Sequence, residues 1–383
     1  MVFALCLPKI SLSGTGAITE LVDRISQTAS KKPLIVTEAA LMKISLPETL
    51  LSQLRDHGIE PAVFDGVVAN PTDHVVAQAL RCYIDNHCDS IIGFGGGSSM
   101  DTAKVVRALI ANPNKTVYEL EGIGKIQKEG PMLSCVSTTS GTAAEVTSNA
   151  VITDTRRKVK MVIIDAAIIP DIAVNDPSLM VGLPSDVTAA TGMDALTHAV
   201  EAYVSTGAHP LTDHSALAAI TTISQALPEA VANGSDIVAR EQMAHGQFLA
   251  GMAFNSAGLG LVHSLAHQPG ATHNLPHGVC NAILLPVLCE FSRQEQPERF
   301  ARIAKAMGVN TEQMSLEEAS KAAITAIKDL SKQVGIPSGL AELGVVEKDI
   351  ERWIAPALAD PCGGTAPRPA NADQVRELYH QAL

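Results

Sequence analysis

The alternation of apolar and polar positions divides the chain into two halves of different character. In the first half, short runs rich in β-branched residues alternate with segments of helical periodicity. The strand-like runs are residues 33–37, 62–64, 90–94, 132–136 and 172–174, and the helix-like segments end at His57 or span residues 73–86 and 102–110. This alternation is typical of βαβ units and predicts a parallel sheet.

The second half shows helical periodicity almost throughout, and β-branched runs become rare. The predicted helices there are residues 186–205, 210–233, 237–255 and 299–307. Gly182 and Pro184 interrupt the chain just after the last strand-like run, which favours a boundary at this point. We therefore expect two domains, an α/β domain over residues 1–182 and an all-α domain over residues 183–383.

Composition and charge narrow the possible functions. A chain of 383 residues exceeds the size at which one hydrophobic core usually stops growing, and 46% hydrophobic residues suffice for two cores. The net charge of −12 argues against binding to nucleic acid, whose phosphates require a basic surface. No apolar run has the length of a membrane span, and the first residues lack the basic flank of a signal peptide. We expect no membrane association and a cytoplasmic protein.

The seven cysteines predict neither a disulfide framework nor a thiolate zinc site. Their number is odd, they are scattered, and no C-x-x-C pair occurs. Most of them are expected to be small buried apolar residues.

A glycine turn follows the strand-like run 90–94. Gly95, Gly96 and Gly97 lead through Ser98 to Asp101 and into a predicted helix. Glycines allow the backbone to approach a pyrophosphate, and the free N–H groups of the first helical turn point toward it. A tight turn capped by a side chain is the alternative interpretation of such a cluster.

The order of signals differs from that of an ordinary dinucleotide fold, in which the glycines precede the acidic residue. Here Glu38 ends a strand and precedes the glycine turn by almost sixty residues. A second turn, residues 137–145, is rich in hydroxyl groups that could bond sugar or phosphate oxygens, or could only cap a helix.

Histidines are concentrated in the second half. Four of the twelve, His263, His267, His273 and His277, fall within fifteen residues. Upstream, a carboxylate and an imidazole are four residues apart at Asp194-Ala-Leu-Thr-His198, and so share one face of a predicted helix. A single pair of this kind is often an ordinary helix contact, but the clusters together favour a metal site.

These motifs together resemble the iron-containing (group III) alcohol dehydrogenase family over essentially the whole chain. The branch with the most similar pattern holds lactaldehyde reductase, 1,3-propanediol dehydrogenase and the iron-type ethanol dehydrogenases. The matching motifs are Gly95-Gly-Gly-Ser-x-x-Asp101-x-x-Lys104, Thr138-Thr-x-Gly-Thr142-x-x-Glu145, Gly192-x-Asp-Ala-x-x-His-Ala-x-Glu-Ala-Tyr203, Gly260-x-x-His-x-x-Ala-His267 and Pro276-His-Gly278. The resemblance implies an N-terminal Rossmann-like α/β domain, an all-α C-terminal domain and a dehydroquinate synthase-like architecture, with one divalent metal in the cleft.

The resemblance also implies roles for individual residues. It makes Asp194, His198, His263 and His277 the metal ligands. Three imidazoles and one carboxylate are compatible with Fe²⁺, Zn²⁺, Co²⁺ or Ni²⁺; affinity alone would favour Zn²⁺ over Fe²⁺, whereas the family name favours Fe²⁺. The residues that it assigns to an NAD(H) cofactor are Glu38, Asn70, Gly96, Gly97, Ser98, Asp101, Thr138, Thr139, Thr142, Lys160 and Leu179. A carboxylate at Glu38 can accept from the ribose hydroxyls and would repel a 2′-phosphate, which favours NAD over NADP.

The implied reaction is hydride transfer between nicotinamide and a small aliphatic alcohol, diol or aldehyde. The metal would act as a Lewis acid, and His267 would be the catalytic residue that passes a proton toward solvent. Its alternative is a histidine that only orients its helix. Asn149, Phe254 and Cys362 match substrate-pocket positions, although the last two could be core residues. Family members are dimers or larger rings, and the apolar run 2–7 is a candidate edge strand for such an interface.

Three other functions remain open at this point. A dehydroquinate synthase-like lyase has the same architecture and uses NAD and metal, but holds its phosphorylated acidic substrate with basic residues that are not clustered here. A zinc hydrolase needs neither the glycine turn nor Glu38. A non-enzymatic metal-binding module leaves the nucleotide turn unexplained.

Overall fold

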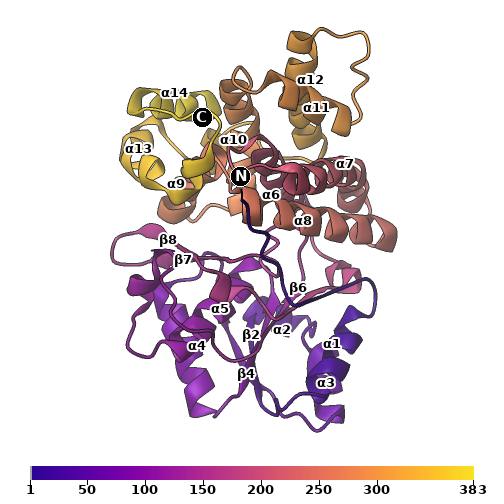
Figure 1. The fold of residues 1–383 in the computed structure, drawn as a ribbon, viewed down its shortest axis with the longest axis vertical. Coiled ribbons are helices and arrows are strands. Elements are labelled where there is room, and N and C mark those ends of the chain that lie inside the picture. Colours follow the sequence, from indigo (N-terminus) through magenta and orange to yellow (C-terminus); the bar gives the residue numbers. More distant parts are fainter. Residues whose placement is uncertain (1) are drawn as a thin grey trace. The chain divides into compact units, whose positions relative to one another are not determined.

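The computed structural model describes residues 2–383, and contacts within the chain divide them into two units. The α/β unit consists of Cys6–Thr139 and Ala143–Val181. The helical unit consists of Gly182–Leu383 together with residues 2–5 and 140–142. Figure 1 shows the strands in the indigo to magenta part of the chain and the orange to yellow part as helices.

The α/β unit is built on a six-stranded, wholly parallel sheet in the order β1-β9-β6-β4-β2-β3. Its strands are β1 (Ile10–Ser13), β2 (Pro33–Glu38), β3 (Ala62–Val67), β4 (Ser90–Gly95), β6 (Leu133–Ser137) and β9 (Ile172–Asn175), and its helices are α1 (Ala17–Ser26), α2 (Ala39–Lys43), α3 (Glu48–Asp56), α4 (Asp73–Asp85) and α5 (Gly97–Ala111). This confirms the prediction of a parallel α/β fold in the first half of the chain.

The central strands are buried on both faces, which explains their unbroken apolar sequences. Every residue of β4 and of β6 is buried. One face packs on a core that includes residues of α4 and α5, and the other on a core that includes residues of α1 and α3. In a parallel sheet the carboxyl ends of neighbouring strands lie at one edge, so Glu38, Gly95 and Ser137, which end β2, β4 and β6, lie along the same edge.

The structure differs from the sequence predictions at several places. The helix predicted up to His57 is two helices, α2 and α3, separated by residues 44–47. A second sheet of β5 (Gly122–Ile123), β8 (Val159–Ile164) and β7 (Asn149–Asp154) was not predicted. No strand forms within the apolar run 2–7, and the two edge strands of the large sheet are β1 and β3.

The turn between β7 and β8 is held by Asp154, whose carboxylate accepts from Arg157 Nε at 2.6 Å and from the backbone N–H groups of Arg156 and Arg157. Burial alone would raise the pKa of Asp154, but these bonds lower it from 3.8 to about 2. A depressed carboxyl pKa stabilises the folded state above the unfolded pKa, and this contribution is lost as pH falls through about 2.

We therefore expect Asp154→Asn to lose about 1–2 kcal/mol of stability at pH 7. Measured as melting temperatures from pH 7 to pH 2, the difference between wild type and variant should shrink below pH 4. A difference that stays constant over this range would show that the ionised carboxylate is not the stabilising group.

The helical unit is formed by nine α-helices among the residues that the structure describes. They are α6 (Ser185–Val204), α7 (Pro210–Ala232), α8 (Ile237–Ala257), α9 (Leu261–His273), α10 (His277–Ser292), α11 (Pro297–Ala306), α12 (Leu316–Gln333), α13 (Ile350–Ala359) and α14 (Ala372–Ala382). Helix α6 packs against α7, α8 and α10, and α9 packs against α10 and α13. The predicted all-helical character of the second half is confirmed.

Across residues 2–383, no helix taken singly has the length and apolar character to span a membrane, and only the pair α8 and α9, bent by 105°, passes on length and composition together.

Candidate active site

Helix α6 carries three chemically important side chains on one buried face. Asp194, His198 and Glu201 follow at positions i, i+4 and i+7, and all three are at most 5% exposed. Close packing fixes the helix here, because a Cβ on Gly192 would lie 2.2 Å from Leu227 Cδ1. Ionisable groups buried in this way require a hydrogen-bond partner, an opposite charge or a metal ion.

Helix α9 carries His263 and His267 and continues through Pro269. A proline within a helix leaves the carbonyl four residues earlier without its N–H partner. That carbonyl is Leu265 O, and the hydroxyl of Tyr379 donates to it at 2.8 Å. The substitute bond accounts for the uninterrupted helix.

Proline and glycine commonly end a helix, but Pro269 and Gly270 lie inside α9. Helix α9 ends at His273, and its C-cap residue Asn274 adopts the left-handed conformation with φ 54°. Pro276 then precedes α10, whose first residue is His277. The short connection places His277 next to the face of α9 that carries His263, with the ring centroids 5.3 Å apart.

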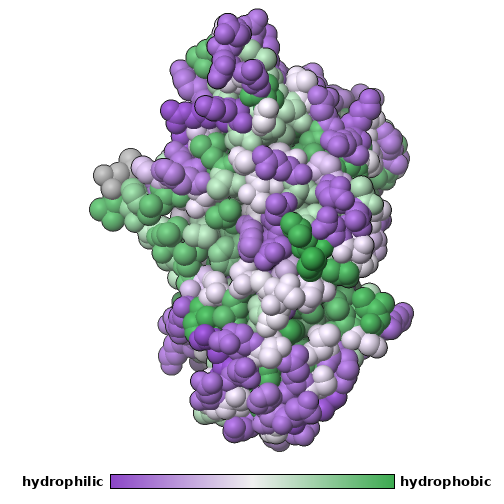
Figure 2. Space-filling view, turned by 90° about the vertical axis from the view of Figure 1, so that its right-hand side faces the viewer, coloured by the Kyte–Doolittle hydropathy of each residue, from purple (hydrophilic) through white to green (hydrophobic). Residues whose placement is uncertain are grey.

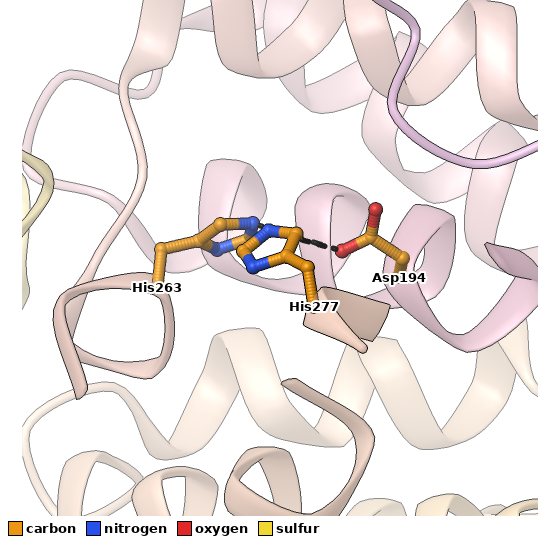
Figure 3. A group of neighbouring side chains, drawn as sticks. All are labelled: Asp194, His263 and His277. Carbon is orange, nitrogen blue, oxygen red and sulfur yellow. Dashed lines mark ion pairs between the residues drawn. The ribbon is translucent and has the colours of Figure 1, made fainter. Parts of the chain in front are cut away.

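Asp194, His263 and His277 converge (Figure 3). One ligand atom from each lies within 4.8 Å of the other two, and Asp194 Oδ1 is 3.9 Å from His263 Nε2 and 3.6 Å from His277 Nε2. Asn281 Nδ2 lies within 3.1 Å of all three of these atoms. Three lone pairs thus point to one small region inside the helical unit.

His198, the fourth predicted ligand, is not among these three. Its ring stacks on His263 with centroids 4.6 Å apart and on Phe254 with centroids 4.3 Å apart. Burial lowers the pKa of His198 to about 4, so its imidazole is neutral near pH 7. A neutral imidazole has one unprotonated nitrogen, as a metal ligand must, and His198 stacks directly on His263 of the cluster.

The donor set fits a divalent transition metal. It consists of one buried carboxylate and imidazole nitrogens, a combination suited to Fe²⁺ or Zn²⁺ and unlike the all-oxygen sites of Mg²⁺ or Ca²⁺. Without a metal, the converging atoms of Asp194, His263 and His277 share one nearby donor, Asn281 Nδ2. A metal bound here would accept the lone pairs of all three atoms.

A second cluster adjoins the first. His267 Nδ1 lies 2.7 Å from Asp360 Oδ2, and the rings of His267 and His277 stack with centroids 5.3 Å apart. Burial opposes ionisation of Asp360, but the contact with His267 holds its pKa below the ordinary value. An ionised Asp360 accepts from Nδ1 and leaves Nε2 of His267 available for proton exchange.

The predicted substrate-pocket residues lie in different units. Phe254 contacts His198 and Cys362 adjoins Asp360 in the helical unit, whereas Asn149 begins β7 in the α/β unit. Burial raises the pKa of Cys362 well above its ordinary value, so this thiol is not a nucleophile near pH 7.

The residues predicted to bind the cofactor, apart from Thr142, lie in the α/β unit. Glu38 ends β2, and Thr138 and Thr139 follow β6. Gly96 is the N-cap residue of α5, and Gly97 and Ser98 lie in its first turn. Asn70 follows β3, Lys160 lies on β8, and Leu179 follows β9. The turn requires glycine at Gly95, where φ is +150° and a Cβ would lie 2.6 Å from Ser99 Oγ. Helix α5 begins at Gly97, five residues before the predicted start, so the glycines stand at its N-terminus.

Asp101 has a structural partner of its own. It accepts from the backbone N–H of Val151 at 3.0 Å, and burial raises its pKa to about 6. Lys104, one turn further along α5, is fully buried and donates to Thr147 and to Asn149 O. These bonds tie α5 to β7.

Glu38 is half-buried at the end of β2, and burial raises the pKa of its carboxyl group.

Three residues of the site were not predicted. Asn281 and Glu201 have a local signal, because they stand four residues after His277 and seven after Asp194 on the same helices. Asp360 has none, since 93 residues separate it from His267.

An α/β unit with a glycine turn at its carboxyl edge and a helical unit with a carboxylate–imidazole centre fit the class of metal-dependent enzymes that use a nicotinamide cofactor. Two family models match, one described as iron-containing alcohol dehydrogenase over residues 8–177 and the other as the C-terminal part of that family over residues 188–383. The chain belongs to the iron-containing alcohol dehydrogenase family, which confirms the resemblance and excludes the hydrolase and the non-enzymatic module.

Relatives agree over the full length. The chain is 43% identical to NAD-dependent methanol dehydrogenase of Bacillus methanolicus, covering 98% of this chain and 99% of that protein. It is also 43% identical to lactaldehyde reductase of Escherichia coli K12, covering 96% of each. A crystal structure of 1,3-propanediol oxidoreductase matches with a TM-score of 0.97 at 43% identity, over 100% of both chains.

Proposed function

We propose that this protein interconverts small aliphatic alcohols or diols and their aldehydes, using NAD(H) and one divalent metal ion. We propose Fe²⁺ as this metal, with Zn²⁺ as the alternative. The observation that carries the proposal is the convergence of Asp194, His263 and His277 within 4.8 Å, with Asp194 and His263 buried and His277 partly buried. The relatives' names include methanol, lactaldehyde and 1,3-propanediol, which supports a substrate of one to three carbons.

The residues divide the work as follows. Asp194, His198, His263 and His277 would hold the metal, which supplies Lewis-acid polarisation of the substrate oxygen when bound. His267, oriented by Asp360, exchanges the alcohol proton through Nε2. The glycine turn would hold the pyrophosphate of NAD, and Glu38 would bond its adenosine ribose. Phe254 and Cys362 would give the substrate an apolar surface in the helical unit.

The proposal is tested by removing the metal. Chelator-treated protein should oxidise NADH with propanal only after anaerobic addition of Fe²⁺, and Zn²⁺ in a parallel sample compares the two metals. Bound NADH without aldehyde reduction under either metal would contradict the proposed reaction and favour a lyase of the same architecture.

We also propose that the enzyme is a cytoplasmic homodimer or larger homo-oligomer. Val2, Phe3 and Leu5 are 100%, 46% and 39% exposed, and β1 is an edge strand, so apolar side chains and unpaired backbone groups are both available to a second copy. Figure 2 shows hydrophobic groups projecting at the left edge of the face in view. The thiols of Cys82, Cys88, Cys135, Cys289 and Cys362 form no disulfides, which suits a reducing compartment.

Light scattering after size exclusion should therefore give at least twice the mass of the 40.1 kDa chain. Phe3→Asp should shift the protein toward the monomer, and a wild type that is monomeric at micromolar concentration would contradict the proposal.

A further inference from the structure

Helix α9 begins without a cap of its own. Its N-cap residue is Gly260, which has no side chain to accept from the first N–H groups of the helix. Glu201 of α6 takes this role from outside, because its Oε1 accepts from the backbone N–H of Val262 at 2.7 Å. The carboxylate fits closely, since a Cβ on Gly260 would lie 2.7 Å from the same oxygen.

The other oxygen of this carboxylate contacts a metal-ligand candidate. Glu201 Oε2 lies 2.6 Å from His263 Nδ1, while Nε2 of the same ring faces Asp194 and His277. Neutral imidazole carries its proton on one nitrogen only. A proton on Nδ1, donated to Glu201, leaves the lone pair on Nε2, the atom within 3.1 Å of Asn281 Nδ2.

Apolar side chains surround much of the Glu201 carboxylate. Glu201 is 5% exposed, and it lines a cavity of about 20 Å³ together with apolar side chains such as Val200, Leu285 and Phe300. Its position seven residues after Asp194 puts it on the same face of α6 two turns later. Helix α6 thus carries both the proposed ligand Asp194 and Glu201, the group that contacts the proposed ligand His263 of α9.

We propose that Glu201 is a positioning residue of the metal centre: it fixes His263 with the proton on Nδ1 and anchors the start of α9, so that Nε2 is presented to the metal. The inference rests on the proposed metal centre. Carboxylates that accept from the remote nitrogen of a ligating histidine raise its basicity and hold its orientation.

The test compares metal affinity with stability in the metal-free protein. Glu201→Gln keeps the size of the side chain but puts an NH₂ group against either Val262 N–H or His263 Nδ1–H. We expect its affinity for Zn²⁺, and for Co²⁺ as a spectroscopic probe, to fall about 10–100-fold in competition with a chelator. The d–d absorption of bound Co²⁺ should change at the same time.

Two further variants separate positioning from capping. Ser264→Ala removes a hydroxyl that bonds Gly260 O in the same first turn of α9 without touching the Glu201–His263 pair, and should keep the wild-type affinity. Glu201→Asp keeps the charge with a shorter reach, and should recover part of the affinity lost in Glu201→Gln; it also provides the comparison if the glutamine variant does not fold.

The outcomes are distinct. A lowered melting temperature of metal-free Glu201→Gln with an affinity within twofold of wild type would overturn the inference and reduce Glu201 to a helix cap. Wild-type protein that binds neither Zn²⁺ nor Co²⁺ would overturn the metal centre itself, and the inference with it.

Discussion

Asp194→Asn is expected to bind metal more than about 100-fold more weakly than wild type. Replacement of a residue that only hydrogen-bonds to a metal ligand already lowers metal affinity about 10–100-fold, and Asp194 is proposed as a ligand itself. Asp194 is the only carboxylate among the three converging groups, and it is 2% exposed. Asparagine keeps the shape but removes the negative charge that offsets a divalent cation in a buried place. Aldehyde reduction should fall with the metal content, and elemental analysis of the purified variant measures that content directly.

Asp186→Asn is the matched control, since Asp186 lies exposed in the first turn of the same helix. It should retain wild-type metal content and activity. An Asp194→Asn protein that still holds one equivalent of metal and reduces aldehyde would show that the three residues converge for another reason, such as helix packing around Asn281.

The α/β fold could be predicted because its central strands are continuous apolar runs, as double burial requires. The hairpin of β7 and β8 escaped prediction for the opposite reason. Its strands mix buried with partly exposed positions, and its turn, Thr155 to Lys158, contains none of the glycine or asparagine residues that mark hairpins. Positive φ at Lys158 is instead supported by the bonds of Asp154, which no local pattern reveals.

The site was predictable where its residues share a helix. Asp194 with His198 and His263 with His267 are four residues apart, and this spacing alone places each pair on one face. Contacts between elements were not predictable in the same way. The bond between Asp360 and His267 depends on how the segment after α13 packs on α9, and the length of α9 depends on a hydroxyl of Tyr379 in the last helix.

His267→Ala is the second change with a large expected effect. The side chain is 3% exposed, its Nδ1 is held by Asp360, and its ring stacks on His277. If it exchanges the alcohol proton, kcat should fall by about 10²–10⁴-fold, the usual contribution of a positioned acid–base group. Metal content and NADH affinity should stay close to wild type, because His267 is not among the converging ligands.

Rescue distinguishes proton exchange from a structural role. Added imidazole should restore part of the kcat of His267→Ala, and the variant's pH–rate profile should differ from that of wild type. Asp360→Asn keeps the ring but weakens the bond that orients it, and should lower kcat less than the alanine variant does. If His267→Ala instead keeps its kcat and an unchanged pH–rate profile while losing thermal stability, His267 serves to orient α9, and the proton must leave the substrate by another path.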